Sequence, residues 1–331
     1  MHRHLPHERM VARCWRLTES LEPRPLSMNA ETNAREDRAT PDHPLDAALA
    51  ARLAFWPSPR TDFGTLEPGW VTAAALFADE AALDDHLAYQ GSFDEAADQK
   101  SRAAFLMCDY CAMFAMTAVP LLVGAGLVPD LRPSNVALQF YSATVEHDGV
   151  TAEVRRAHVR LLSRAFFTEK LSDAAHADAA VLQDRAGLCA GFREGVEDHF
   201  TGLIEALNDR TKLARSAMWR LVGDALAATF LEAGRRYGCL EDAKAMALAV
   251  LKHPGSPLKN RQLHFLDVAG ADDACPGRVV ATHTFRARGG CCRYYLLDGR
   301  KLCSTCVLHE PAARERLLQN VMRRRLGLPA A

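Results

Sequence analysis

Four cysteines near the end of the chain have the residue types and the spacing of a metal centre. Cys291 and Cys292 are adjacent, and after ten intervening residues Cys303 and Cys306 form a C-x2-C pair. Thiols that come from two points so close in sequence can surround one centre without help from the rest of the chain. An all-sulfur donor set suits zinc or an iron–sulfur cluster and does not suit magnesium or calcium.

The adjacent pair Cys291-Cys292 favours a cluster over a single ion. Structural zinc sites usually take their thiolates from two C-x2-4-C knuckles. Neighbouring side chains on a regular strand point to opposite faces, so irregular backbone is needed here, and Gly289 and Gly290 can supply it because glycine adopts positive φ freely. Two bridged irons spread their ligand positions more widely than one zinc ion. The residues alone therefore favour an iron–sulfur cluster, with structural zinc, reactive thiols and buried cysteines as the alternatives.

The C-C-x10-C-x2-C pattern, with the intervening Arg293-Tyr294-Tyr295, resembles the C-terminal signature of the FhuF-type ferric-siderophore reductases. In that family four cysteines hold a [2Fe–2S] cluster, and the protein passes one electron to siderophore-bound iron. Roughly the last fifty residues carry the resemblance, and the longer segment before them is compatible in size and helical character. The resemblance implies that four residues ligate the cluster: Cys291, Cys292, Cys303 and Cys306.

The function implied by this resemblance is the one-electron reduction of ferric iron to ferrous iron, which siderophore oxygens hold less well. Its partners would be a ferric siderophore and an electron donor such as a ferredoxin, a flavodoxin or a flavin reductase. The alternative is a non-redox binding protein in which the four cysteines hold a structural zinc ion. The helical body also resembles the C-terminal part of aerobactin-type siderophore synthetases. Those enzymes need an ATP site, and the sequence contains no basic, glycine-bearing motif that indicates one.

Composition indicates a globular protein in a reducing compartment. The chain has 331 residues, 49% of them hydrophobic and 24% charged, which allows an ample core. A formal net charge of −1 provides no global field that attracts nucleic acid or anionic lipid. The ten cysteines occur without a secretion signal, so we expect free thiols and a cytoplasmic location.

We predict an α+β fold with a mostly helical body, a small antiparallel sheet and a compact C-terminal iron–sulfur segment. Residues 1–44 are expected to form a disordered tail, within which Met28 is an alternative start. Residues 45–275 would form the siderophore-binding body, and residues 276–331 the cluster-binding segment. Alternating apolar residues over 134–156, interrupted by Asp-Gly, predict a β-hairpin.

An uncharged apolar run, Ala112–Val128, is near the lower limit for a membrane span. Pro120 and two glycines interrupt it, so we expect a buried helix that ends near Pro120, followed by an apolar loop. Peripheral attachment to the inner membrane is the furthest membrane involvement that the sequence supports. Cys108 and Cys111 lie in the same expected helix, where a C-x-x-C pair can be a redox dithiol. Because the surrounding run is apolar, we expect both to act as small hydrophobic residues.

Helical periodicity predicts further elements in the body. The expected helices span 71–89, 157–170, 173–207 and 209–234, the last with Asp209 as its N-cap. His199 is expected at the surface or at the edge of the core. A small hairpin over 293–302 would present Cys303 and Cys306.

Cationic and aromatic residues are candidates for contact with an anionic ferric siderophore. Arg215 and Trp219 are one turn apart and could meet on one helix edge, although solvated charges and a packed tryptophan explain them more simply. Arg288 and Arg293 flank the cysteines, where positive charge raises a cluster's reduction potential. The candidate substrate-binding residues are Arg215, Trp219, Arg288 and Arg293.

Overall fold

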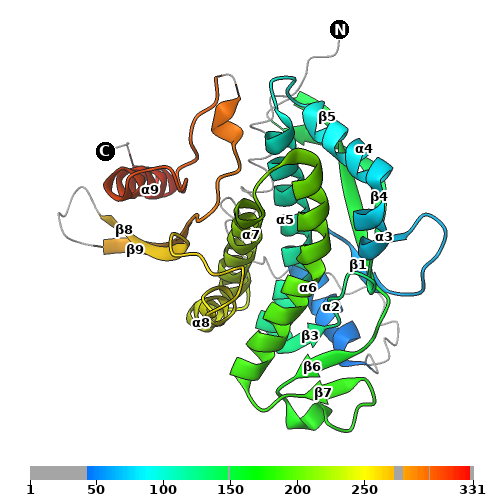
Figure 1. The fold of residues 1–331 in the computed structure, drawn as a ribbon. Helices are drawn as coiled ribbons and strands as arrows, with labels where there is room; N and C mark the ends of the chain where they lie inside the picture. The colour runs from blue at the N-terminus through cyan, green and yellow to red at the C-terminus, as the bar shows by residue number, and fades with distance from the viewer. Residues whose placement is uncertain (1–42, 148–149, 272–278, 298, 329–331) are drawn as a thin grey trace, which may run out of the picture.

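The computed structural model describes residues 43–147, 150–271, 279–297 and 299–328 (Figure 1). It is 51% helical with small sheets, which confirms the predicted α+β class. The predicted tail, with the alternative start at Met28, lies almost wholly outside the described residues. The predicted boundary at 275/276 also lies outside them.

The body is built around α5 (Gln99–Ala125), which packs chiefly against α7 (Arg215–Arg236). Figure 1 shows α6 (Arg185–Thr211) beside this pair, with α8 (Leu240–Leu251) next to α7. The apolar faces of these helices share one large core. Its fully buried members include Met107, Phe192, Phe200, Val222 and Phe230.

The helix α5 continues past Pro120, so the predicted end at that residue is wrong. Gly126, in a left-handed conformation, terminates it instead. Proline cannot donate to the carbonyl four residues earlier, but the Nε of Arg52, from α2 (Pro44–Phe55), donates to that Met116 carbonyl at 2.9 Å. A tertiary contact thus supplies the donor that the local sequence lacks.

The α5 helix is long and apolar enough to cross a membrane by length and composition, yet 78% of its most apolar window is buried. Its buried side chains contact α7, α6 and α2 inside the body. The buried positions include Cys108 and Cys111, which are 3% and 1% exposed. Both cysteines therefore occupy core positions, as predicted.

The predicted hairpin is present as β4 (Val136–His147) and β5 (Val150–Leu161), with Asp148-Gly149 outside the described residues. With β1 (Thr61–Phe63) and β2 (Val71–Thr72) it forms a mixed sheet of order β1-β5-β4-β2. The strand β5 occupies the first part of the predicted helix 157–170, which is therefore wrong. Pairing of Val159 and Leu161 with buried β4 residues overrides the local helical pattern.

A second small sheet joins β3 (Leu127–Pro129), β6 (Phe166–Thr168) and β7 (Ala179–Val181). A short 3-10 turn, η1 (Leu171–Asp173), follows β6, so the predicted helix 173–207 begins only at α6. Asp184 caps α6 by accepting the N–H of Gly187 at 2.8 Å. Side-chain capping thus places the start of this helix.

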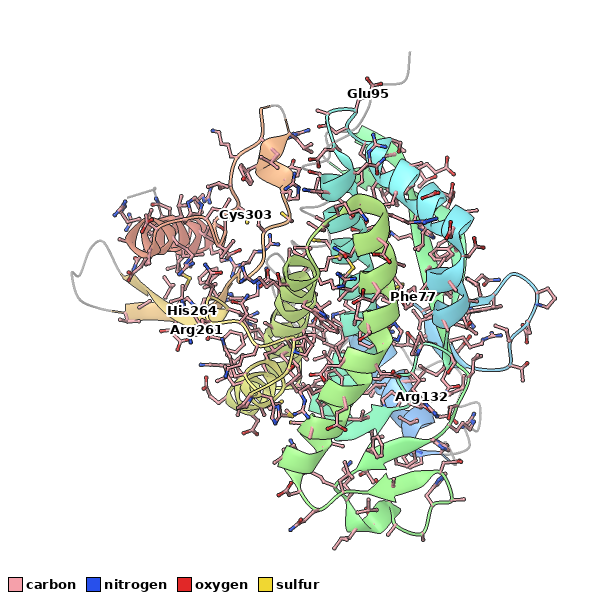
Figure 2. All side chains as sticks on the ribbon, viewed as in Figure 1. Phe77, Glu95, Arg132, Arg261, His264 and Cys303 are labelled. Carbon is pink, nitrogen blue, oxygen red and sulfur yellow. The ribbon has the colours of Figure 1, made fainter. Side chains whose placement is uncertain are left out.

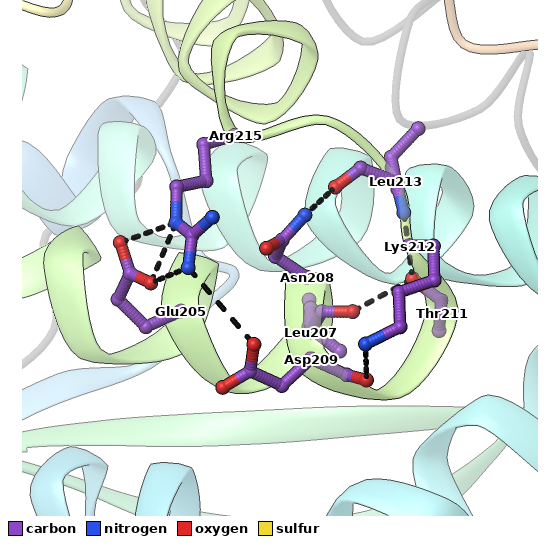
Figure 3. Close-up of polar contacts among 8 residues, drawn as sticks. All are labelled: Glu205, Leu207, Asn208, Asp209, Thr211, Lys212, Leu213 and Arg215. Carbon is purple, nitrogen blue, oxygen red and sulfur yellow. Dashed lines mark hydrogen bonds and ion pairs between the residues drawn. The ribbon is translucent and has the colours of Figure 1, made fainter.

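Two other predicted helices are divided. The segment 71–89 contains β2, then α3 (Ala73–Ala78) and α4 (Glu80–Gly91), because Asp79 caps a new helix by accepting the N–H of Ala82. The segment 209–234 contains the end of α6 and most of α7. Lys212, in a left-handed conformation at φ 56°, ends α6 before α7 begins. Asp209 therefore lies inside α6 and is not an N-cap (Figure 3).

The C-terminal part has its own small core. Strands β8 (His264–Ala271) and β9 (Val279–Ala287) form an antiparallel pair, and α9 (Pro311–Arg325) packs against it. Val268 and Phe285 of the strands contact Leu318 and Met322 of the helix. Between β9 and α9 the cysteine segment passes close to the body (Figure 1). It contains a 3-10 turn, η2 (Tyr294–Leu296), where a hairpin over 293–302 was predicted, so that prediction is wrong.

Candidate metal centre

The two glycines before the cysteines bring the chain against α7. The backbone N–H groups of Gly289 and Gly290 donate to the fully buried Asp224 carboxylate at 2.8 and 3.0 Å. A Cβ on Gly290 would lie 3.0 Å from the Arg220 backbone, and one on Gly289 would lie 2.0 Å from Asn260 Nδ2. Neither glycine has positive φ. Glycine is needed at both positions because the backbone passes so close to α7 and to Asn260. The prediction that these glycines supply positive φ is wrong.

Arg288 connects this carboxylate to the thiols. Its guanidinium is buried and donates from Nε to Asp224 Oδ2 at 3.1 Å. The Nη1 atom lies 3.5 Å from Cys292 Sγ and 3.6 Å from Cys303 Sγ. Burial alone lowers the pKa of Arg288, but the charges of both cysteines and Asp224 hold it well above its ordinary value. One permanent cation therefore joins sulfurs from both halves of the motif.

Backbone contacts shape the second half of the motif. The N–H of Cys306 donates to the Cys303 carbonyl at 2.9 Å, and Arg288 N–H donates to the Thr305 carbonyl at 3.1 Å. A hydrogen bond from the Cys306 thiol, together with the charge of Arg288, holds the pKa of Cys303 well below its ordinary value. The same bond raises the pKa of Cys306. The two thiols of the C-x2-C pair thus share a hydrogen bond close to the Arg288 guanidinium.

The first half of the motif is tied to α5. Arg293 has left-handed backbone, at φ 63°, and its N–H lies 3.4 Å from Cys291 Sγ. Its side chain reaches Asp98 Oδ2 at 2.7 Å and Ser101 Oγ at 3.2 Å. Asp98 is the N-cap of α5. The motif is therefore held by α5 on one side and by α7 on the other.

The four thiols differ in exposure. Cys292 and Cys306 are buried, Cys291 is half-buried and Cys303 is exposed. Figure 2 shows Cys303 on the segment between the body and α9. The pKa of Cys108 is raised by burial and by the charge of Cys292, so this α5 thiol is also near the motif.

The donor set fits an iron–sulfur cluster better than one zinc ion. Around zinc, bonds of about 2.3 Å in tetrahedral geometry place sulfurs about 3.8 Å apart. Among the described residues, no three of these thiols lie within 4.8 Å of one another. The Arg288 guanidinium nevertheless contacts both Cys292 and Cys303, and the Cys303 sulfur shares a hydrogen bond with the Cys306 thiol. This wider grouping suits ligands divided between two irons.

A second group of side chains that could bind a metal combines His43, at the start of α2, with His176 and Asp178, just before β7. The Nδ1 atoms of the two histidines accept N–H groups, from Leu45 and Asp178 respectively, each at 3.2 Å. A histidine that binds a metal normally donates from its other ring nitrogen. These rings hold the opposite tautomer, so we assign no metal to them.

The predicted substrate residues fall into two places. Arg288 and Arg293 are at the cysteines, as described above. Arg215 forks onto Glu205, with Nε–O distances of 2.7 and 2.6 Å, and lies 3.9 Å from Asp209 (Figure 3). Trp219 is 9% exposed and belongs to the main core. The structure thus pairs Arg215 at the α6–α7 junction and packs Trp219 in the core, and their role in siderophore binding stays a prediction.

Asp224 is the residue that the sequence analysis missed. It is the lone charged residue between Leu221 and Leu231 on the apolar helix α7. A charge in such a stretch is seldom buried without a partner, and this was the available signal. Its partner Arg288 is 64 residues away in sequence, so the pairing could not be read from spacing.

A comparison with known families agrees with this geometry. The family model described as the FhuF 2Fe-2S C-terminal domain matches residues 288–308. The match begins at Arg288, contains all four cysteines and indicates a [2Fe–2S] cluster cofactor. It supports the FhuF family through this segment alone. No curated protein and no solved structure is detectably similar to the chain.

Proposed function

We propose that this protein is a ferric-siderophore reductase of the cytoplasm, which transfers one electron to siderophore-bound Fe(III) and releases Fe(II). The observation that carries the proposal is the bridge from Asp224 of α7 through Arg288 to Cys292 and Cys303. Of these residues, Arg288 and the two cysteines lie in the segment that the FhuF 2Fe-2S model matches. A [2Fe–2S] cluster, when bound, supplies one electron per cycle. This stoichiometry equals the one-electron change of the iron.

The residues of this chain have separate tasks in the proposal. Cys291, Cys292, Cys303 and Cys306 hold the cofactor. Arg288 donates N–H groups to two sulfurs and offsets their negative charge, which favours the reduced state. Cys303 is exposed, so it marks the side on which electrons enter or leave.

The proposed substrate is an iron chelate whose hard oxygen donors bind ferric iron much better than ferrous iron. Reduction therefore loosens the complex, and no acid–base residue is needed. Arg215, Trp219, Arg288 and Arg293 remain the proposed siderophore contacts. The proposed donor is a ferredoxin, a flavodoxin or a flavin reductase, and peripheral attachment to the inner membrane is compatible with this role.

The test is Cys303→Ser in the full chain, purified without oxygen. We expect the variant to lose most of its bound iron and its visible absorption, and to stop reducing a ferric hydroxamate or catecholate siderophore. Cys189→Ser is the matched control, because Cys189 is buried in α6 away from the motif. Retained colour and full reductase activity in Cys303→Ser would refute the proposal.

A further inference from the structure

An arginine without a counter-charge lines a partly open cavity of the body. The cavity has a volume of about 120 Å³ and lies between α4, α5 and the β4–β5 hairpin, from which Arg155 and Arg156 line it. A neighbouring hollow of about 440 Å³ shares four of its lining residues, Leu76, His86, Phe140 and Arg155. A ligand that enters the cavity can therefore extend beyond it.

The charge of Arg156 is not balanced by a contact within the described chain. Its side chain is half-buried, and its guanidinium makes no hydrogen bond or ion pair with any residue that the structure describes. The neighbouring cation, Arg155, is bonded to Asp85 at 2.7 Å. Of the described residues that line the cavity, Asp109 is the one carboxylate. It accepts an N–H of Gln90 at 2.9 Å and does not pair with Arg156. The counter-charge of Arg156 is therefore left to an occupant.

A second hydrogen-bond donor lies close to Arg156. The Tyr89 hydroxyl accepts the backbone N–H of Arg155 at 2.7 Å, so its own proton is left to donate. Burial raises the pKa of Tyr89, although the charges of Arg155 and Arg156 act against it, and the hydroxyl stays protonated at pH 7. His86 adds no charge, because burial lowers its pKa to about 4. A guanidinium with a hydroxyl close by suits a carboxylate, since both donate to its oxygens.

The rest of the cavity is apolar. Between Tyr110 and Val123 of α5, only Ala112, Met113 and Met116 are not buried, and all three line the cavity. Aromatic walls come from Phe77 of α3 and Phe140 of β4. Methionine side chains adapt to irregular shapes and make favourable sulfur–aromatic contacts. These walls suit the apolar body of a small organic molecule.

We propose that this cavity binds an organic carboxylate with an apolar body, whose carboxylate group pairs with Arg156 and the Tyr89 hydroxyl. The apolar body then lies against Met113, Met116 and Phe140. The proposal rests on the cavity and its lining residues, so it stands or falls independently of the reductase function.

The test compares three probes on the purified full chain: benzoate, benzamide and acetate. Binding is measured by ligand-observed NMR titration. Benzoate should bind about tenfold more tightly than benzamide, which has the same shape but no charge. It should also bind at least about tenfold more tightly than acetate, which lacks the apolar body. Equal affinity for benzoate and benzamide, or for benzoate and acetate, would overturn the proposal.

A charge variant tests the role of the arginine. Arg156→Gln should lower the affinity for benzoate about tenfold, to the level of benzamide, and should leave the affinity for benzamide unchanged. Arg324→Gln, on the exposed face of α9, is the matched control and should bind both probes like the parent. Unchanged benzoate affinity in Arg156→Gln would overturn the assignment of this residue.

A size variant locates the site. Met113→Trp fills the cavity and should abolish benzoate binding, whereas Leu317→Trp adds the same side chain to the exposed face of α9 and should not. Circular dichroism shows whether each variant is folded. Benzoate binding that persists in a folded Met113→Trp protein would contradict the placement of the ligand in this cavity.

Discussion

At the scale of single residues, the Asp224–Arg288 pair decides how the cysteine motif is held. Both side chains are almost fully excluded from solvent, at 0% and 3% exposure. Removing one partner of such a pair typically costs about 3–5 kcal/mol, because it leaves a buried charge uncompensated. The pair is satisfied only when Gly289, Gly290 and the sulfurs are in place. Folding of the motif and orientation of the guanidinium are therefore coupled.

The first prediction concerns Arg288→Lys. Lysine keeps the charge but lacks the planar fork, so it cannot reach Asp224 and two sulfurs together. We expect the reduction potential of the loaded protein to become more negative, because hydrogen bonds to the sulfurs are lost. Potentiometric titration followed by visible absorption measures the shift. Arg316→Lys, on the exposed face of α9, is the control, and an unchanged potential in Arg288→Lys would contradict this role.

His199 gives the second prediction at this scale. It was expected at the surface or core edge but is fully buried, bonded to Tyr110 Oη and the Leu131 carbonyl, each at 2.8 Å. Burial lowers its pKa from 6.5 to about 4. The unfolded chain therefore binds more protons below pH 6.5, and stability falls as the pH drops from there toward 4.

We expect His199 to account for about 2 kcal/mol of the stability lost between pH 7 and pH 5. Urea unfolding at both pH values measures it. His199→Gln should be less stable than the parent at pH 7 but should lose less on acidification. An identical loss in both proteins would show that His199 does not titrate in this way.

At the scale of elements, α5 shows how a tertiary contact overrides a local signal. Arg52 is fully buried and donates from Nε to Met116 and from Nη1 to the Pro59 carbonyl at 2.7 Å. It thereby satisfies the carbonyl that Pro120 leaves open. The continuation of α5 to Ala125 depends on a residue 68 positions before the proline.

The third prediction uses this dependence. Arg52→Met keeps the length of the side chain but cannot donate, so it should lower the free energy of unfolding by about 1–3 kcal/mol. Pro120→Ala restores an N–H for the Met116 carbonyl. The cost of Arg52→Met should therefore be smaller in the Pro120→Ala background, as measured by urea unfolding. Additive effects in the double variant would contradict the account.

The predicted elements that proved right have strong local signals. The β4–β5 hairpin has alternating apolar residues on both sides of an Asp-Gly turn signal, and the buried Cys108 and Cys111 lie in a largely apolar stretch. The wrong predictions depend on contacts distant in sequence, such as the pairing of Val159 with Leu138. The cysteines, Arg288 and Arg293 could be named from spacing. The closing contact to Asp224 could not, because it forms only when α7 is packed against the motif.

At the scale of the whole molecule, charge is distributed unevenly. Residues 286–331 contain ten Lys and Arg against three Asp and Glu, although the chain as a whole is near neutral at −1. The exposed Cys303 lies in this basic part, together with exposed Lys301. An acidic electron-donor protein would be attracted to this side.

The fourth prediction is that reduction by an acidic ferredoxin or flavodoxin slows as salt is raised, because surface charges are screened. Lys301→Glu should lower the second-order rate at low salt by a few-fold. The matched control, Lys170→Glu, places the same change on an exposed residue near β6 and should have little effect. Stopped-flow absorption measures both. A second-order rate that changes neither with salt concentration nor in Lys301→Glu would exclude electrostatic docking on this side.

The central claim is that the four cysteines hold a [2Fe–2S] cluster, and one measurement tests it most directly. It is the absorption spectrum of the full chain purified without oxygen, with analysis of iron, sulfide and zinc on the same sample. We expect a red-brown protein with about two irons and two sulfides per chain, bleached by dithionite. A colourless protein with one zinc per chain would contradict the account.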